Sequence, residues 1–124
     1  MKMYERMIRY KAIFMQGDQK ETVEYKEKGV FFNGERKKIS FRAQEKTIEI
    51  SYDEKRISLK HGDSLLKMHR DKEVWNEYLL PYGSVRLKTR VLMYEASHEA
   101  LKLKYELSDD RGVLSTAYVL ITMV

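Results

Sequence analysis

The amino-acid sequence predicts an all-β protein in which one antiparallel sheet of about eight to ten strands curls into a barrel. Three observations predict this class. Apolar and polar residues alternate with a period of two along most of the chain, turn residues separate these segments at short intervals, and no segment has a clear helical period. Most segments have one polar side, which favours a sheet closed on itself with a solvated outer face.

The clearest alternation lies in a long hairpin of residues 84–94 and 99–107, which follows a turn-like hinge at residues 78–83. In the returning arm, four apolar residues alternate with charged ones: Leu101, Leu103, Tyr105 and Leu107. A strand places all four on one face, whereas a helix would divide them between two opposed sides. In the first arm, five residues share a face in the same way: Val85, Leu87, Thr89, Val91 and Met93.

Other segments with the same alternation precede and follow this hairpin. We expect strands at residues 3–15, 20–26, 30–32, 36–43, 47–52, 57–59, 65–70, 74–80 and 113–124. Residues 3–15 also fit a helical stripe, but their aromatic and β-branched content favours a strand.

Asn33-Gly34 predicts a two-residue hairpin turn, because both positions of such a turn need positive φ. The last strand is apolar on both faces, which predicts a place in the middle of the assembly or in a subunit contact.

Length and composition bound the class of protein. A chain of 124 residues has room for one domain, residues 1–124, and its single proline and six glycines leave no linker. The absence of cysteine excludes disulfides and cysteine-ligated metals and fits a reducing compartment. Charged residues interrupt the apolar N-terminus, so we expect a soluble, cytoplasmic protein without a membrane partner. The net charge of +5 permits an anionic partner without requiring one.

The C-terminal half contains a motif that resembles a known family. Tyr78-x-x-Pro81-Tyr82-Gly83 precedes a short strand with Thr89, and Tyr105-x-Leu107 follows in the next strand. This pattern is similar to that of the YwiB-like proteins, a bacterial family of unknown function. The family usually has a threonine before Pro-Tyr-Gly, where this chain has Leu80. The resemblance implies a calycin-like β-barrel, related in shape to the lipocalins, and brings no known activity with it.

The interior or mouth of the predicted barrel is the first candidate site. An antiparallel barrel of about eight strands is either filled by its own side chains or holds one small ligand. The expected inner faces carry many tyrosines for a small core: Tyr25, Tyr52, Tyr78, Tyr82, Tyr105 and Tyr118. A buried hydroxyl needs a hydrogen-bond partner, which a ligand or an ordered water would supply. The alternative is a packed core whose tyrosines reach backbone carbonyls or the rim.

The outer face of the long hairpin is the second candidate site, for RNA or another polyanion. If Leu87 and Leu103 point inward, five cations and one aromatic residue point outward: Arg86, Lys88, Arg90, Lys102, Lys104 and Tyr94. Pairing about a turn near Ser97 is expected to bring Arg90 near Lys102 and Lys88 near Lys104. This basic strip has the residue types of a groove for single-stranded nucleic acid. A solvated face that discourages edge association is the competing interpretation.

The sequence predicts no catalytic site, metal site or cofactor. His61, His69 and His98 fall in or near three separate turns without metal-ligand spacing, and no serine lies in a nucleophile elbow. We therefore expect a non-enzymatic binding module for a small apolar or amphipathic ligand, with RNA or polyanion binding as the first alternative. A structural or interaction protein, including a homodimer, is the second alternative.

Overall fold

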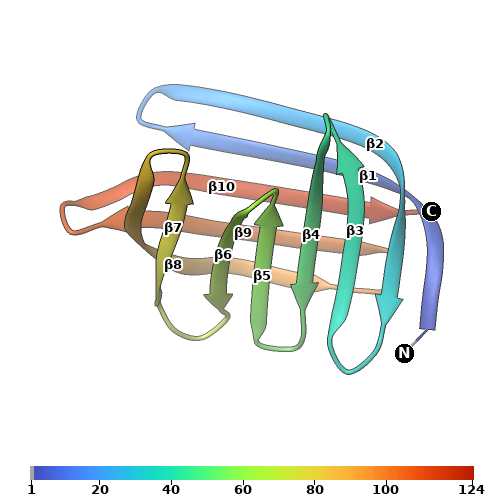
Figure 1. Ribbon diagram of the computed structural model, residues 1–124. Helices are drawn as coiled ribbons and strands as arrows, with labels where there is room; N and C mark the ends of the chain where they lie inside the picture. Colours follow the sequence, from blue (N-terminus) through green and yellow to red (C-terminus); the bar gives the residue numbers. More distant parts are fainter. Residues whose placement is uncertain (1) are drawn as a thin grey trace.

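The computed structural model describes residues 2–124, and ten antiparallel strands form one sheet (Figure 1). The strands are β1 (Lys2–Gln16), β2 (Gln19–Asn33), β3 (Lys37–Ala43), β4 (Lys46–Tyr52), β5 (Arg56–His61), β6 (Ser64–His69), β7 (Val74–Leu80), β8 (Gly83–Ala96), β9 (Ala100–Asp109) and β10 (Gly112–Met123). Their order in the sheet is β6-β5-β4-β3-β2-β1-β10-β9-β8-β7. The predicted all-β, antiparallel class is therefore confirmed. Residues 2–124 contain no helix long and apolar enough to cross a lipid bilayer.

The sheet folds over on itself, so that β3–β7 cross in front of β8–β10 at a steep angle (Figure 1). The long strand β2 bends to connect the two layers. Gly29 belongs to both ladders of this strand, opposite Arg6 of β1 and Phe41 of β3. A Cβ atom at Gly29 would collide with the Ile8 side chain and the Ser40 carbonyl, so the close approach of these strands requires glycine.

The core lies between the layers and follows the predicted alternation. Leu101, Leu103 and Tyr105 of β9 are buried, whereas the intervening Lys102 and Lys104 are exposed. β10 buries four alternating residues: Ala117, Val119, Ile121 and Met123. This strand lies between β1 and β9, well inside the sheet, as its apolar character on both faces predicts.

The strands at the two ends of the sheet order, β6 and β7, meet at a seam that side chains close. The Asn76 amide oxygen accepts a hydrogen bond from the Lys67 backbone N–H at 2.7 Å, and the Asn76 amide nitrogen donates to the Lys67 carbonyl at 3.0 Å. The Thr89 hydroxyl donates to the same carbonyl at 2.8 Å. Asn76 therefore replaces the two backbone bonds that a neighbouring strand would make, and the barrel is nearly closed.

The connection between β2 and β3 differs from the predicted two-residue turn. Backbone pairing ends at Phe32 and Lys38, which leaves a longer loop, and Gly34 does not adopt positive φ. The Arg36 side chain reaches from this loop to the Asp53 carboxylate at 3.2 Å. The Asn33-Gly34 prediction is wrong because Gly34 lacks the positive φ that a two-residue turn requires, and Arg36 of the longer loop contacts the β4–β5 turn instead.

The register of β8 and β9 also differs from the prediction. Arg90 lies opposite Glu106 and Lys88 opposite Ser108, so the expected cation pairs with Lys102 and Lys104 do not form. The strands extend to Ala96 and Ala100, which moves the centre of the turn along the chain. In addition, a β-bulge between Val91 and Met93 inserts one residue into β8.

Candidate functional site

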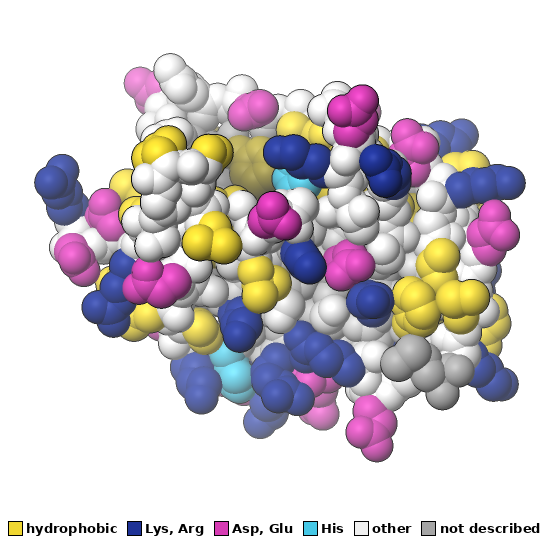
Figure 2. All heavy atoms as spheres, viewed as in Figure 1, with side chains coloured by type: hydrophobic (Ala, Val, Ile, Leu, Met, Phe, Trp, Pro, Cys, Tyr) yellow, Lys and Arg dark blue, Asp and Glu magenta, His cyan; other side chains and the backbone are white. Residues whose placement is uncertain are grey.

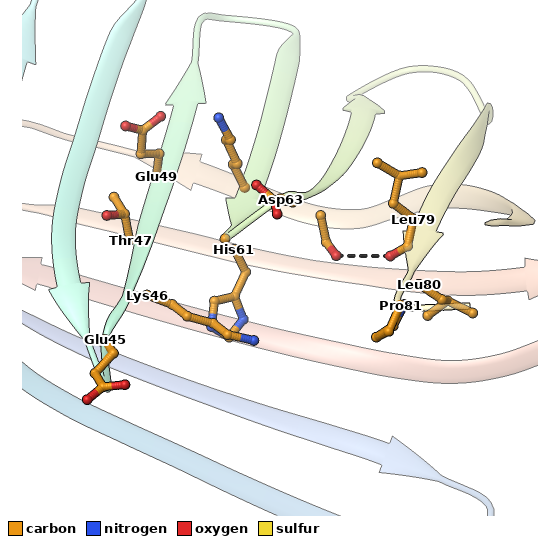
Figure 3. Close-up of a pocket in the computed structure, with 12 residues that line it drawn as sticks. Glu45, Lys46, Thr47, Glu49, His61, Asp63, Leu79, Leu80 and Pro81 are labelled. Carbon is orange, nitrogen blue, oxygen red and sulfur yellow. Dashed lines mark hydrogen bonds between the residues drawn. The ribbon is translucent and has the colours of Figure 1, made fainter. Parts of the chain in front are cut away.

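The open end of the barrel, which we call the mouth, is formed by the β3–β4 turn, the β5–β6 turn and the end of β7 (Figure 3). Gln44 and Glu45 adopt positive φ in the first turn, and Gly62 does so in the second. The Gly62 backbone N–H donates to the Thr47 carbonyl at 3.0 Å, which ties the two turns together. The Ser64 hydroxyl donates to the Leu79 carbonyl at 3.1 Å, as the dashed line in Figure 3 shows. A hollow of about 840 Å³ lies between these elements.

A smaller cavity of about 120 Å³ lies on the inner side of the mouth and shares Lys60, His61 and Ser64 with the outer hollow. Five apolar side chains line it: Phe14, Ile48, Ile50, Leu59 and Leu66. Its volume exceeds the roughly 15 Å³ that one water requires by several-fold. The interior is therefore incompletely filled at this end.

Three tyrosines, Tyr10, Tyr78 and Tyr105, contribute to the wall of this cavity. Burial raises the pKa of Tyr10 to about 12, and Tyr25 adds to the shift. Burial likewise raises the pKa of the Tyr105 phenol well above its ordinary value. Both groups are therefore neutral at physiological pH and retain their hydroxyl protons. Among the described residues, Tyr94 is the one tyrosine whose hydroxyl makes a hydrogen bond within the protein, so the hydroxyls of the cavity phenols have no protein partner.

The charges of the mouth differ between its inner and outer parts. The inner cavity has one charged lining residue, Lys60, whereas the outer hollow also carries Glu45, Lys46, Glu49 and Asp63. Burial, together with the positive charge of Lys46, lowers the pKa of His61 below its ordinary value. His61 is therefore neutral at physiological pH. Each polar lining group of the inner cavity can donate a hydrogen bond, and no carboxylate is among them.

The six tyrosines predicted to face the interior divide into two groups. Tyr52 and Tyr105 are buried, and Tyr25 and Tyr78 are half-buried against the core. Two of the predictions are wrong: Tyr82 and Tyr118. Tyr82 is 87% exposed because it lies in the tight turn between β7 and β8. Tyr118 points outward because its neighbours in β10, Ala117 and Val119, occupy the inner face.

Tyr10 lines the inner cavity but was not among the tyrosines predicted as site residues. The alternation that places Ile8, Ala12 and Phe14 on one face of the first strand places Tyr10 there too. This alternation is the sequence signal from which Tyr10 could have been predicted to face the interior. Whether the hydroxyl of an inner-face tyrosine is free cannot be seen in the alternation itself.

The end of the barrel opposite the mouth, which we call the far end, is held together by polar contacts. The Tyr94 hydroxyl donates to the Asp53 carbonyl at 2.7 Å, and the Asp53 carboxylate contacts Arg36 at 3.2 Å and Arg56 at 3.0 Å. Burial acts to raise the pKa of Asp53, but hydrogen bonds from the Arg56 and Lys55 backbone amides, and the Arg56 charge, lower it to about 2. Tyr52 is buried beside this network, and its hydroxyl has no partner.

Tyr94 was predicted to point outward with the basic strip, and that prediction is wrong. The bulge at Leu92 reverses which residues of β8 face inward, so that Tyr94 lies opposite the buried Leu103 and packs against the core. Met93 instead lies opposite the exposed Lys104.

Acidic and aromatic neighbours engage part of the basic strip. The Lys88 ammonium contacts the Glu73 carboxylate at 2.7 Å, and Arg90 contacts Glu106 at 3.8 Å. The Arg86 guanidinium lies 4.4 Å from the centre of the Trp75 ring. The hydrogen bond and charge of Lys88 lower the pKa of Glu73. No salt bridge among the described residues involves the other three cations: Arg86, Lys102 and Lys104. Polyanion binding by the strip stays a prediction.

The three histidines lie apart from one another. His61 lies at the mouth, the Nδ1 atom of His69 accepts a hydrogen bond from the Asp71 backbone N–H at 3.0 Å, and His98 is exposed in the β8–β9 turn. In the described part of the chain, no three His, Asp or Glu side chains gather as metal ligands would.

Comparison with solved structures supplies the decisive observation about the fold. The crystal structure of YwiB from Bacillus subtilis superposes with a TM-score of 0.75 over 97% of this chain and 92% of that protein. The chain shares the fold of YwiB. The two sequences are 11% identical, so the likeness concerns the fold alone. No protein-family model and no curated protein matches the sequence.

The likeness to YwiB extends over nearly the whole barrel, whereas the motif that suggested it lies in the C-terminal half. The barrel expected from that motif is confirmed. A ligand, an activity and a cellular location do not follow from a shared fold.

Proposed function

We propose that this protein is a non-enzymatic binding module whose mouth holds a small amphipathic ligand. The observation that carries the proposal is the inner cavity, where free phenol hydroxyls surround a space with an apolar wall. Apolar pockets with a few convergent polar groups are the usual form of a small-molecule site.

The chemistry of the lining defines the class of ligand. Ile48, Ile50 and Leu66 favour an aliphatic end because they are buried and offer no polar atom. Neutral Tyr10 and Tyr105, together with cationic Lys60, donate hydrogen bonds. The polar end of the ligand is therefore an acceptor, such as a carboxylate or a carbonyl oxygen. The volume of about 120 Å³ favours a short chain.

Mass spectrometry under non-denaturing conditions tests for a resident ligand in protein purified from its own host. We expect a species heavier than the 14.8 kDa chain, which returns to the chain mass after denaturation. Hexanoate is a suitable probe for protein stripped in this way. Chemical-shift changes confined to the cavity-lining residues are the expected response in NMR spectra.

Two matched variants separate cavity binding from surface adsorption. Leu59→Phe adds volume to a cavity-lining residue of β5, and Leu65→Phe makes the same change at an exposed residue of β6. We expect Leu59→Phe to abolish the hexanoate response and Leu65→Phe to retain it. A bare chain mass from the host, together with equal hexanoate responses in the two variants, would contradict the proposal.

A further inference from the structure

A second concave surface lies outside the barrel, at the far end. Lys and Arg side chains gather around a histidine along the lower edge of the molecule, where β5 begins and β6 ends (Figure 2). Within this region, a groove of about 410 Å³ is lined by six polar residues that we call the basic groove: Arg36, Arg56, Ser58, Lys67, His69 and Lys72. Its volume falls within the range of roughly 300–1,000 Å³ that is typical of small-ligand sites.

The basic groove has an unbalanced charge. None of its lining residues is an aspartate or a glutamate, in contrast to the mouth, where Glu45, Glu49 and Asp63 accompany the cations. Lys67 and Lys72 make no salt bridge with any described residue. One carboxylate, that of Asp53, contacts Arg36 and Arg56, and the positive charge of the groove exceeds it, which favours an anionic ligand.

Two guanidinium groups at the groove are held in place before any ligand arrives. The Asp53 carboxylate contacts both Arg36 and Arg56, and Arg36 also donates to the Ser58 hydroxyl at 3.1 Å. Arg56 uses its Nε and one terminal nitrogen for Asp53, so its other terminal nitrogen is free to donate. A fixed guanidinium pair loses less conformational entropy on binding an oxyanion than two mobile side chains would.

The strand pairing spaces the remaining cations across the groove. Ser58 lies opposite Lys67, and Arg56 lies opposite His69, so both of these cross-strand pairs on the outer face present a basic group. Lys72 follows at the turn into β7. These donors come from two strands and a turn. Such a spread of donors matches the several oxygens of a phosphate ester better than the two oxygens of a single carboxylate.

We propose that the basic groove binds a phosphate-bearing ligand of nucleotide size, either free or as part of a single RNA strand. This site is distinct from the mouth and from the strip on β8 and β9. It does not depend on the proposed ligand of the barrel interior.

Calorimetric titration with two probes, ADP and a short oligouridylate, tests this inference at low ionic strength. Binding of ADP would show that a free nucleotide is sufficient to occupy the groove. Binding of the oligouridylate without ADP identifies an RNA strand as the source of the phosphates.

The decisive variant is the pair Lys67→Gln and Lys72→Gln, because neither side chain has a salt-bridge partner to lose in the described structure. We expect this double variant to weaken binding by about tenfold or more, since each charge-assisted contact contributes of the order of one factor of ten. The control pair is Lys20→Gln and Lys26→Gln on β2, which removes the same charge from exposed residues outside the groove and outside the basic strip. Binding should change less than about twofold in the control.

Three outcomes would overturn the proposal. Neither probe binds the unmodified protein, both double variants lose affinity equally, or the protein binds vesicles of anionic phospholipid while it ignores both probes. Retained binding of ADP in the Leu59→Phe variant of the mouth would further separate the two sites.

Discussion

The two ends of the barrel use tyrosine in different ways. At the far end, the Tyr94 hydroxyl is bound to the Asp53 carbonyl, and the Asp53 carboxylate in turn holds two arginines. At the mouth, Tyr10, Tyr78 and Tyr105 surround a cavity. A tyrosine whose hydroxyl is bound within the protein contributes to stability, whereas one that faces a cavity is available to a ligand. The proposed binding end is the mouth because its hydroxyls face a cavity, whereas the unpartnered Tyr52 hydroxyl of the far end is enclosed in the core.

The seam joins the two ends, and its loss should have the largest effect on stability. Asn76→Ala removes both hydrogen bonds to Lys67, so the Lys67 backbone N–H loses its partner and the Lys67 carbonyl keeps only the bond from Thr89. We expect the free energy of unfolding to fall by about 2–4 kcal/mol. Urea denaturation measures the change, with Asn33→Ala as the control at a strand end. Equal midpoints for the two variants would show that side chains do not close the barrel.

A smaller but still large effect is expected from the acidic residue of the far end. Asp53→Ala removes the contacts to Arg36 and Arg56 and the acceptor of the Arg56 backbone amide at 2.7 Å. We expect a loss of about 2 kcal/mol, whereas Asp63→Ala in the β5–β6 turn of the mouth should cost less than about 0.5 kcal/mol. Thermal unfolding of both variants would measure the contrast between the two ends.

The contribution of Asp53 should also depend on pH. Its pKa is lowered from 3.8 to about 2 in the folded protein, so the ionised carboxylate stabilises the fold above pH 3.8. This stabilisation is lost as the pH falls from 3.8 through about 2. The difference in stability between the unmodified protein and Asp53→Ala should therefore narrow in acid. If the difference in unfolding free energy between the two proteins stays constant down to pH 2, Asp53 stabilises the fold through packing rather than through its charge.

The two tyrosines of the far end should respond differently to loss of the hydroxyl. Tyr94→Phe removes a 2.7 Å hydrogen bond and should cost about 1 kcal/mol. Tyr52→Phe removes a buried hydroxyl without a partner, so stability should stay the same or rise by a few tenths of a kcal/mol. Urea midpoints measure both variants. A destabilising Tyr52→Phe substitution would reveal an ordered water on that hydroxyl.

The smallest change in stability is expected at the mouth. Tyr10→Phe and Tyr105→Phe remove hydroxyls that line the cavity, so the free energy of unfolding should change by less than about 0.5 kcal/mol. The same substitutions should weaken hexanoate binding by about threefold to tenfold, because each removes a donor. Loss of stability without loss of binding would assign these phenols to the core rather than to a site.

The strands and their faces could be predicted from the sequence to a large extent. Residues 65–70 and 74–80 were expected as strands, and β6 and β7 occupy Ser64–His69 and Val74–Leu80. The inward positions of Leu101, Leu103 and Tyr105 are also confirmed. The candidate site was predicted less well: Tyr78 and Tyr105 line the cavity, Tyr82 and Tyr118 face away from the core, and Tyr10 was not selected.

The sequence by itself determined the all-β class, because a period of two is a property of consecutive residues and each strand expresses it locally. Only the tertiary structure decided where the bulge turns Tyr94 inward, that Asn76 closes the seam, and which phenols remain free. These features depend on contacts between distant residues: Tyr94 and Asp53 lie 41 positions apart. Alternation predicts the face to which a side chain belongs, and the folded chain decides what the side chain meets there.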